Sequence, residues 1–102
     1  MAKPFAIAVS EGVREDVEGL RAYDREIILD AIETQLTHTP SRETKNRKLL
    51  LNLVPPFEAI PPIWQLRVGV FRVFYDVNEE ERRVYIRAIR RKPGHLKTEE
   101  VL

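Results

Sequence analysis

The chain has 102 residues, 43% of them hydrophobic, and this apolar content supports one modest core but not two. Its formal net charge is only +1, and the absence of cysteine excludes disulfides and thiolate metal sites. With His38 and His95 as the sole imidazoles, we expect neither a metal nor a cofactor. No apolar run is long enough to span a bilayer and no signal-peptide core follows the first residues, so we expect a cytoplasmic protein without a membrane partner.

Charge is distributed unevenly along the chain. Residues 11–33 hold eight acidic side chains against three arginines, whereas residues 67–97 hold nine basic side chains against four acidic ones confined to residues 76–81. Local fields, rather than the net charge, attract an anionic ligand. The C-terminal half is therefore expected to bind a polyanion such as RNA, or an acidic protein.

The N-terminal half of the chain predicts a strand followed by two helices. Residues 4–9 are rich in apolar side chains typical of a strand, and Ser10 is a good helix N-cap. A second helix begins near residues 22–24, and Pro40 closes it. The positions expected to face the core are Val13, Val17 and Leu20 in the first helix, and Ile27, Ile28, Ala31, Ile32, Gln35 and Leu36 in the second.

The middle of the chain lacks periodicity. Residues 40–48 are polar and predict a loop, whereas residues 49–53 fit either a strand or a buried irregular segment. The proline pairs at 55–56 and 61–62 forbid regular helix and central strand between them. Because neither flank is large enough to fold alone, we treat residues 1–102 as one domain.

The C-terminal half predicts an antiparallel sheet. Residues 63–68 alternate as a strand does, and a two-residue turn at Val68 and Gly69 places Gln65 opposite Arg72. A third strand, residues 84–91, follows an acidic turn. The side chains expected to face the helices are Trp64, Leu66, Phe71, Val73, Tyr75, Val77, Val84, Ile86 and Ala88. The expected fold class is α+β, with a strand and a two-helix hairpin packed on this sheet.

The opposite side of this sheet is expected to be open and to carry Gln65, Arg67, Arg72, Arg87 and Arg91. Guanidinium groups bind phosphate oxygens bidentately and stay charged, so this side suits a phosphate backbone. The alternative is that these charges are simply where an antiparallel sheet meets water.

The same segment carries a recognisable motif. Its first part reads Trp-Gln-Leu-Arg-Val-Gly-Val-Phe-Arg-Val-Phe-Tyr-Asp-Val from residue 64, and Val-Tyr-Ile-Arg-Ala-Ile-Arg-Arg-Lys follows from residue 84. This pattern resembles the RelE/ParE superfamily of bacterial toxins, whose hairpin has the form W-x-L-R-x-G-x-[YF]-R-[VI]-x-Y. The resemblance implies a RelE-like fold and the toxin of a type II toxin-antitoxin module. It also implies a cognate antitoxin that forms a hetero-oligomeric complex with the toxin.

The resemblance further implies an endoribonuclease that cuts messenger RNA, on the ribosome in the RelE branch, without a metal. Arg72 matches the arginine expected to hold the scissile phosphate, and Arg91 matches one that stabilises transition-state charge. His95 is the candidate general acid or base, because an imidazole exchanges protons near neutral pH. The residues expected to bind RNA are Gln65, Arg67, Arg87, Lys48 and Lys92.

Two other functions stay open. Ribonuclease-active relatives often carry lysines where this chain has Ile63 and Gln65, which keeps a ParE-like inhibitor of DNA gyrase as an alternative. The third possibility is a weakly toxic or inactive toxin-fold protein that binds its antitoxin. Its functional surface would be an apolar groove between Val13, Leu20 and the proline-rich segment.

Overall fold

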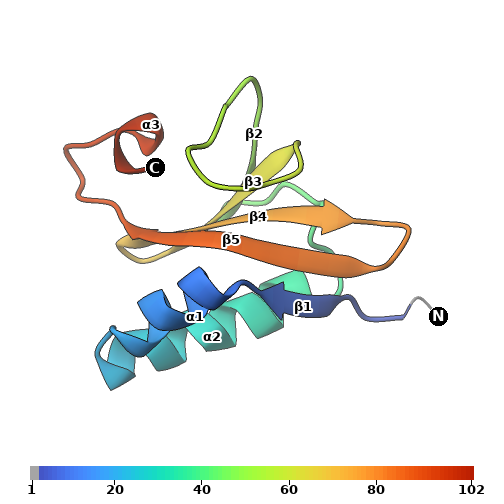
Figure 1. Ribbon diagram of the computed structural model, residues 1–102, viewed down its shortest axis with the longest axis horizontal. Helices are drawn as coiled ribbons and strands as arrows, with labels where there is room; N and C mark the ends of the chain where they lie inside the picture. Colours follow the sequence, from blue (N-terminus) through green and yellow to red (C-terminus); the bar gives the residue numbers. More distant parts are fainter. Residues whose placement is uncertain (1–2) are drawn as a thin grey trace.

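A computed structural model describes residues 3–102, except for the side chain of Glu99. Helices α1 and α2 cover one side of a five-stranded sheet, and α3 lies on the other side with the loop between β2 and β3 (Figure 1). Among the described residues, no helix is long and apolar enough to cross a membrane. The elements are β1 (Ala6–Val9), α1 (Glu11–Glu18), α2 (Ala22–Leu36), β2 (Arg47–Leu50), β3 (Ile63–Val68), β4 (Phe71–Asn78), β5 (Arg83–Arg91) and α3 (Thr98–Val101).

The strands are ordered β1-β5-β4-β3-β2 across the sheet. Strands β2 to β5 are antiparallel to their neighbours, as expected, whereas β1 pairs with β5 in parallel, so the sheet is mixed. This pairing extends only from Arg83 to Ile86 of β5. Beyond Ile86, the outer edge of β5 therefore has no neighbouring strand within residues 3–102.

The two helices form as the sequence predicts. Ser10 caps α1 by accepting a hydrogen bond from the Val13 N–H at 3.3 Å. Ile27 was expected to be buried, but its side chain is 42% exposed because the buried stripe of α2 follows an i, i+4 spacing that excludes it. The buried positions of the two helices are Val13, Val17, Ile28, Ile32 and Leu36.

Two polar side chains attach the end of α2 and the segment after it to the sheet. Arg47 begins β2, although its position in the polar stretch predicted a loop, and its side chain is buried. Its Nη1 donates to the carbonyl oxygens of Gln35, at 2.8 Å, and of Thr39, near the negative end of the helix dipole. The Tyr75 hydroxyl donates to the Pro40 carbonyl oxygen at 2.7 Å.

The β3–β4 hairpin turns at Gly69 and Val70, one residue later than predicted. Val68 pairs with Phe71, Arg67 with Arg72, and Gly69 has a φ of +58°. The predicted turn would have forced positive φ on a β-branched valine at its first position, whereas the observed turn puts glycine there. Each residue of β3 therefore pairs with a residue of β4 two positions later than predicted. Because side chains alternate with a period of two, they stay on their predicted faces of the sheet. We call the side against α1 and α2 the helix face, and the opposite side, which carries Arg67 and Arg72, the arginine face.

A β-bulge in β5 changes which residues reach each face. Tyr75 pairs with Ile86 but Phe74 pairs with Ala88, so Arg87 is an extra residue between them. The alternation is reversed beyond this point. Ala88 was expected in the helix-face core, but it packs on the arginine face, and Ile89 takes the core position.

The arginine face is not open as predicted. Ile63, Phe74 and Ala88 form a second apolar cluster there, against which Phe57, Ala59, Leu50 and Leu102 pack. The proline-rich loop and the C-terminal segment thus cover part of this face (Figure 1). The predicted groove between Val13, Leu20 and the proline-rich segment is wrong, because Val13 and Leu20 belong to the core on the helix face.

Replacing Tyr75 with phenylalanine is expected to lower the free energy of unfolding by about 1–2 kcal/mol, because the buried Pro40 carbonyl loses its donor. Burial raises the pKa of Tyr75 above its ordinary value of 10.0, against a smaller opposing effect of Arg47. Above pH 10 the unfolded chain therefore releases this proton before the folded chain does, and stability declines with rising pH. Urea denaturation between pH 8 and about 11 checks both effects.

The matched control is Tyr23→Phe, because Tyr23 is 72% exposed. It should change neither the stability at pH 8 nor the decline above pH 10. If the free energy of unfolding declines above pH 10 as steeply in Tyr75→Phe as in the unmodified chain, the decline does not come from Tyr75.

Candidate polyanion-binding site

Three arginines lie side by side across adjacent strands of the arginine face. Arg67 on β3 pairs with Arg72 on β4, which pairs with Arg90 on β5. We call this set the arginine row. Like charges directly opposite one another destabilise a sheet. Among the side chains that the structure describes, no carboxylate forms an ion pair with Arg67 or Arg72. Arg67 and Arg72 are therefore adjacent positive charges that no described carboxylate compensates.

Arg72, at the centre of the row, is held by backbone carbonyls. Its Nη1 donates to the carbonyl oxygens of Gly69 and Phe71, both at 2.8 Å, and the residue is only 8% exposed. Burial and then the charge of Arg67 lower the pKa of Arg72, yet a guanidinium stays protonated at neutral pH. The charge is thus fixed in position under the hairpin turn before any ligand arrives.

Arg90 replaces Arg91 in this row because of the bulge. Arg91 pairs with Phe71 and lies over that ring, with its guanidinium carbon 5.9 Å from the ring centroid, on the helix face. The predicted position of Arg91 on the arginine face is therefore wrong. Sequence reasoning missed Arg90, although two consecutive apolar residues, Ala88 and Ile89, were a signal that the alternation breaks there.

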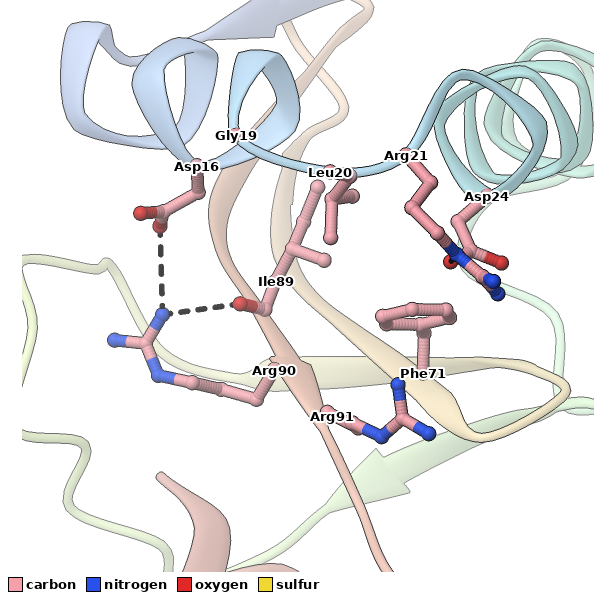
Figure 2. Close-up of a pocket in the computed structure, with 9 residues that line it drawn as sticks. All are labelled: Asp16, Gly19, Leu20, Arg21, Asp24, Phe71, Ile89, Arg90 and Arg91. Atoms are coloured by element: carbon pink, nitrogen blue, oxygen red, sulfur yellow. Dashed lines mark hydrogen bonds and ion pairs between the residues drawn. The ribbon is translucent and has the colours of Figure 1, made fainter.

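Arg90 also reaches around the free edge of β5. Its Nη1 lies 3.6 Å from Oδ2 of Asp16 on α1, and both side chains are partly exposed (Figure 2). Exposed pairs of this kind are weak, typically below about 1 kcal/mol. Arg90 is therefore able to exchange Asp16 for another anion at little cost.

Two of the residues predicted to bind RNA already have partners. Arg87, the extra residue of the bulge, donates from Nε to Oδ2 of Asp76 at 2.6 Å and lies over the ring of Tyr85. The buried Gln65 accepts a hydrogen bond from the Thr98 hydroxyl at 3.0 Å, so α3 covers it. Neither side chain is available to a ligand in this arrangement.

The remaining predicted residues lie around the row. Lys48 is exposed on β2 opposite Gln65. Lys92 follows β5, and its N–H donates to the Val70 carbonyl oxygen at 2.6 Å, which attaches the segment after β5 to the hairpin turn. His95 is exposed in the turn between β5 and α3. The row, Lys48 and Lys92 thus form the basic end of the sheet.

Removing the Arg67 charge is expected to stabilise the fold. Arg67→Gln relieves repulsion with Arg72, so the free energy of unfolding should rise by a few tenths of a kcal/mol at low ionic strength. The gain should shrink in about 0.5 M salt, because screening already weakens the repulsion. Urea denaturation at the two salt concentrations measures this difference.

Arg42→Gln, at an exposed position in the loop before β2, is the matched control and should show no gain. A loss of stability in Arg67→Gln at low salt would show that the row is not electrostatically strained.

The family of the chain follows from comparison with known proteins. Residues 7–92 match the model of the ParE toxin of the type II toxin-antitoxin system parDE. A search of curated proteins found no match.

Two solved structures share the fold. One is the toxin-antitoxin complex RelBE2 from Mycobacterium tuberculosis, with a TM-score of 0.70 and 17% identity over 87% of this chain and 99% of that one. The other is an archaeal RelE-RelB complex from Pyrococcus horikoshii OT3, with a TM-score of 0.63 and 18% identity over 90% of this chain and 98% of that one. The α+β fold expected from the sequence is confirmed. The chain belongs to the ParE/RelE superfamily of toxins of type II toxin-antitoxin systems.

Proposed function

We propose that this toxin is an endoribonuclease that binds messenger RNA at the arginine row, cuts it without a metal and so inhibits translation. The observation that carries the proposal is the position of Arg72 between Arg67 and Arg90, with no carboxylate paired to it among the described side chains. A phosphate backbone relieves this repulsion by supplying the missing negative charge.

The proposed reaction is the attack of a ribose 2′-oxygen on the adjacent phosphorus, with the 5′-oxygen as leaving group. A base takes the 2′-hydroxyl proton and an acid protonates the 5′-oxygen, which leaves a 2′,3′-cyclic phosphate and a 5′-hydroxyl. Charge builds up on the phosphoryl oxygens in between. Because Gly69 and Phe71 fix the Arg72 guanidinium in advance, it would stabilise this charge without reorganisation.

Arg90 takes the second charge-stabilising role in this proposal. It lies directly opposite Arg72, whereas Arg91 is on the helix face. His95 remains the candidate proton donor or acceptor, since it is exposed in the segment that Lys92 attaches to the hairpin turn. Lys48 and Lys92 would follow the RNA backbone on either side of the row, and the ribosome would present the message.

A cognate antitoxin is the proposed protein partner. Both solved relatives are complexes, one the toxin-antitoxin complex RelBE2 and the other a RelE-RelB complex. We propose that this toxin likewise forms a hetero-oligomer with an antitoxin that covers the arginine row and neutralises it.

Inhibition of DNA gyrase is the second candidate function. Two observations favour it: the matching family model describes a ParE toxin, and β3 carries Ile63 and Gln65, both buried, where ribonuclease-active relatives often have lysines. A gyrase inhibitor requires a complementary surface rather than an acid and a base. The arginine row would then contact an acidic surface of the target.

Arg72→Ala and Arg90→Ala are each expected to reduce message cleavage by about 100-fold, the effect of removing one oxyanion-stabilising donor. Purified variants are added to a translating extract, and the ends of the message are sequenced. Arg83→Ala, at the opposite end of β5, is the matched control and should cleave normally. Thermal unfolding verifies that each variant is folded.

The outcomes separate the candidate functions. Intact messages together with cleaved DNA trapped on purified gyrase would replace the ribonuclease proposal with gyrase inhibition. Normal cleavage by both Arg72→Ala and Arg90→Ala would disprove the site. Activity in neither assay would leave the inactive antitoxin-binding protein.

His95→Ala is expected to slow cleavage while leaving RNA affinity unchanged, because a proton carrier acts on the reaction rather than on binding. Single-turnover cleavage rates and fluorescence anisotropy with a labelled RNA measure the two quantities. A parallel loss of affinity and rate would make His95 a binding residue. His38→Ala, on the exposed segment after α2, is the control.

A further inference from the structure

A cleft of about 540 Å³ lies on the helix face, between the turn that joins α1 to α2, the start of β4 and the end of β5. Its floor is apolar and consists of Leu20, Phe71 and Ile89 (Figure 2). A volume of this size is in the range of sites that bind small molecules or the side chains of a partner. Of the residues that line this cleft, only Arg90 takes part in the proposed RNA chemistry.

The charged rim of the cleft is nearly neutralised by its own ion pairs. Asp16 faces Arg90 at 3.6 Å, and Nε of Arg21 donates to Oδ2 of Asp24 at 3.2 Å. The fifth charged side chain, Arg91, has no carboxylate within 4.0 Å among the side chains that the structure describes. It stands over the Phe71 ring at the mouth of the cleft (Figure 2). One positive charge is therefore left for a ligand.

We infer that this cleft binds a segment of a partner protein in which a large apolar side chain lies next to a single carboxylate. The apolar side chain would fill the floor over Leu20 and Ile89, and the carboxylate would pair with Arg91. Aromatic and arginine side chains are the usual anchors of protein interfaces, and here Phe71 and Arg91 supply both.

The charges of the rim favour a peptide over a nucleic acid. A chain of phosphates brings several negative charges, whereas the rim offers only the charge of Arg91 to pair with them. The carboxylates of Asp16 and Asp24 would repel the remaining phosphates. Carboxylate oxygens do accept hydrogen bonds from peptide N–H groups, and that of Asp16 is half exposed. A polypeptide with one acidic side chain therefore suits the rim, because its carboxylate can pair with Arg91 and its N–H groups can donate to Asp16.

The cognate antitoxin is the partner that we expect to supply this segment. The identity of the partner thus rests on the proposed function, whereas the class of ligand rests on the cleft alone. Because Arg90 belongs to the rim as well as to the arginine row, a segment bound here would also cover one end of the row.

The test uses the full chain, labelled with ¹⁵N, and two capped dipeptides, acetyl-Trp-Glu-amide and acetyl-Trp-Gln-amide. We expect saturable chemical-shift changes at the amides of Leu20, Phe71 and Ile89. The glutamate peptide should bind about fivefold more tightly than the glutamine peptide, the size of an exposed ion pair. Arg91→Gln should abolish this preference, Arg91→Lys should restore it in part, and Arg83→Gln should leave it unchanged.

Three results would overturn the inference: shifts that do not localise to the cleft, equal binding of both peptides, or tighter binding of a uridine tetranucleotide at the same amides. Mixing the toxin with the product of the adjacent open reading frame tests the partner separately. If the peptides bind as expected and that product does not bind, the cleft assignment holds and the identity of the partner fails.

Discussion

The bulge at Arg87 is the constraint on which the surface chemistry of this toxin depends. One extra residue in β5 reverses the alternation for the rest of the strand, so Ile89 enters the core and Arg90 comes opposite Arg72. Without the bulge, Ile89 would lie on the arginine face and Arg90 would be directed at the core. The pair between Arg87 and Asp76 uses the side chain of the extra residue and holds the bulge in place.

The arginine row is expected to destabilise the sheet. The row places neighbouring cations directly opposite one another, and the buried Arg72 pairs with no carboxylate among the side chains that the structure describes. The carbonyl oxygens of Gly69 and Phe71 accept two hydrogen bonds from its Nη1 but supply no full negative charge. Contacts elsewhere offset this repulsion, including the bond from Tyr75 that joins the sheet to the segment after α2. Such a local conflict between charges is typical of a functional site.

Sequence reasoning succeeds here where local patterns determine the outcome. Ser10 caps α1, and the motif around Arg72 identifies the family, since both depend on nearby residues. The turn at Gly69 was misplaced because glycine fits more than one hairpin register. The bulge leaves only a weak local signal, the consecutive apolar residues Ala88 and Ile89, and its position depends on how Ala88 packs against Phe74 across the sheet. The covering of Gln65 by Thr98 leaves no local signal, because the two residues are distant in the chain.

Arg90 connects the two faces of the sheet. It is opposite Arg72 by strand register, yet its guanidinium lies beside Asp16 at the edge of the cleft. An arginine cannot pair fully with a phosphate on one face and a carboxylate on the other. If the row binds phosphate as proposed, any ligand that strengthens the contact between Arg90 and Asp16 weakens that binding, and by linkage phosphate weakens the contact equally. Antitoxin and RNA would then compete through a shared side chain even where their own surfaces do not overlap.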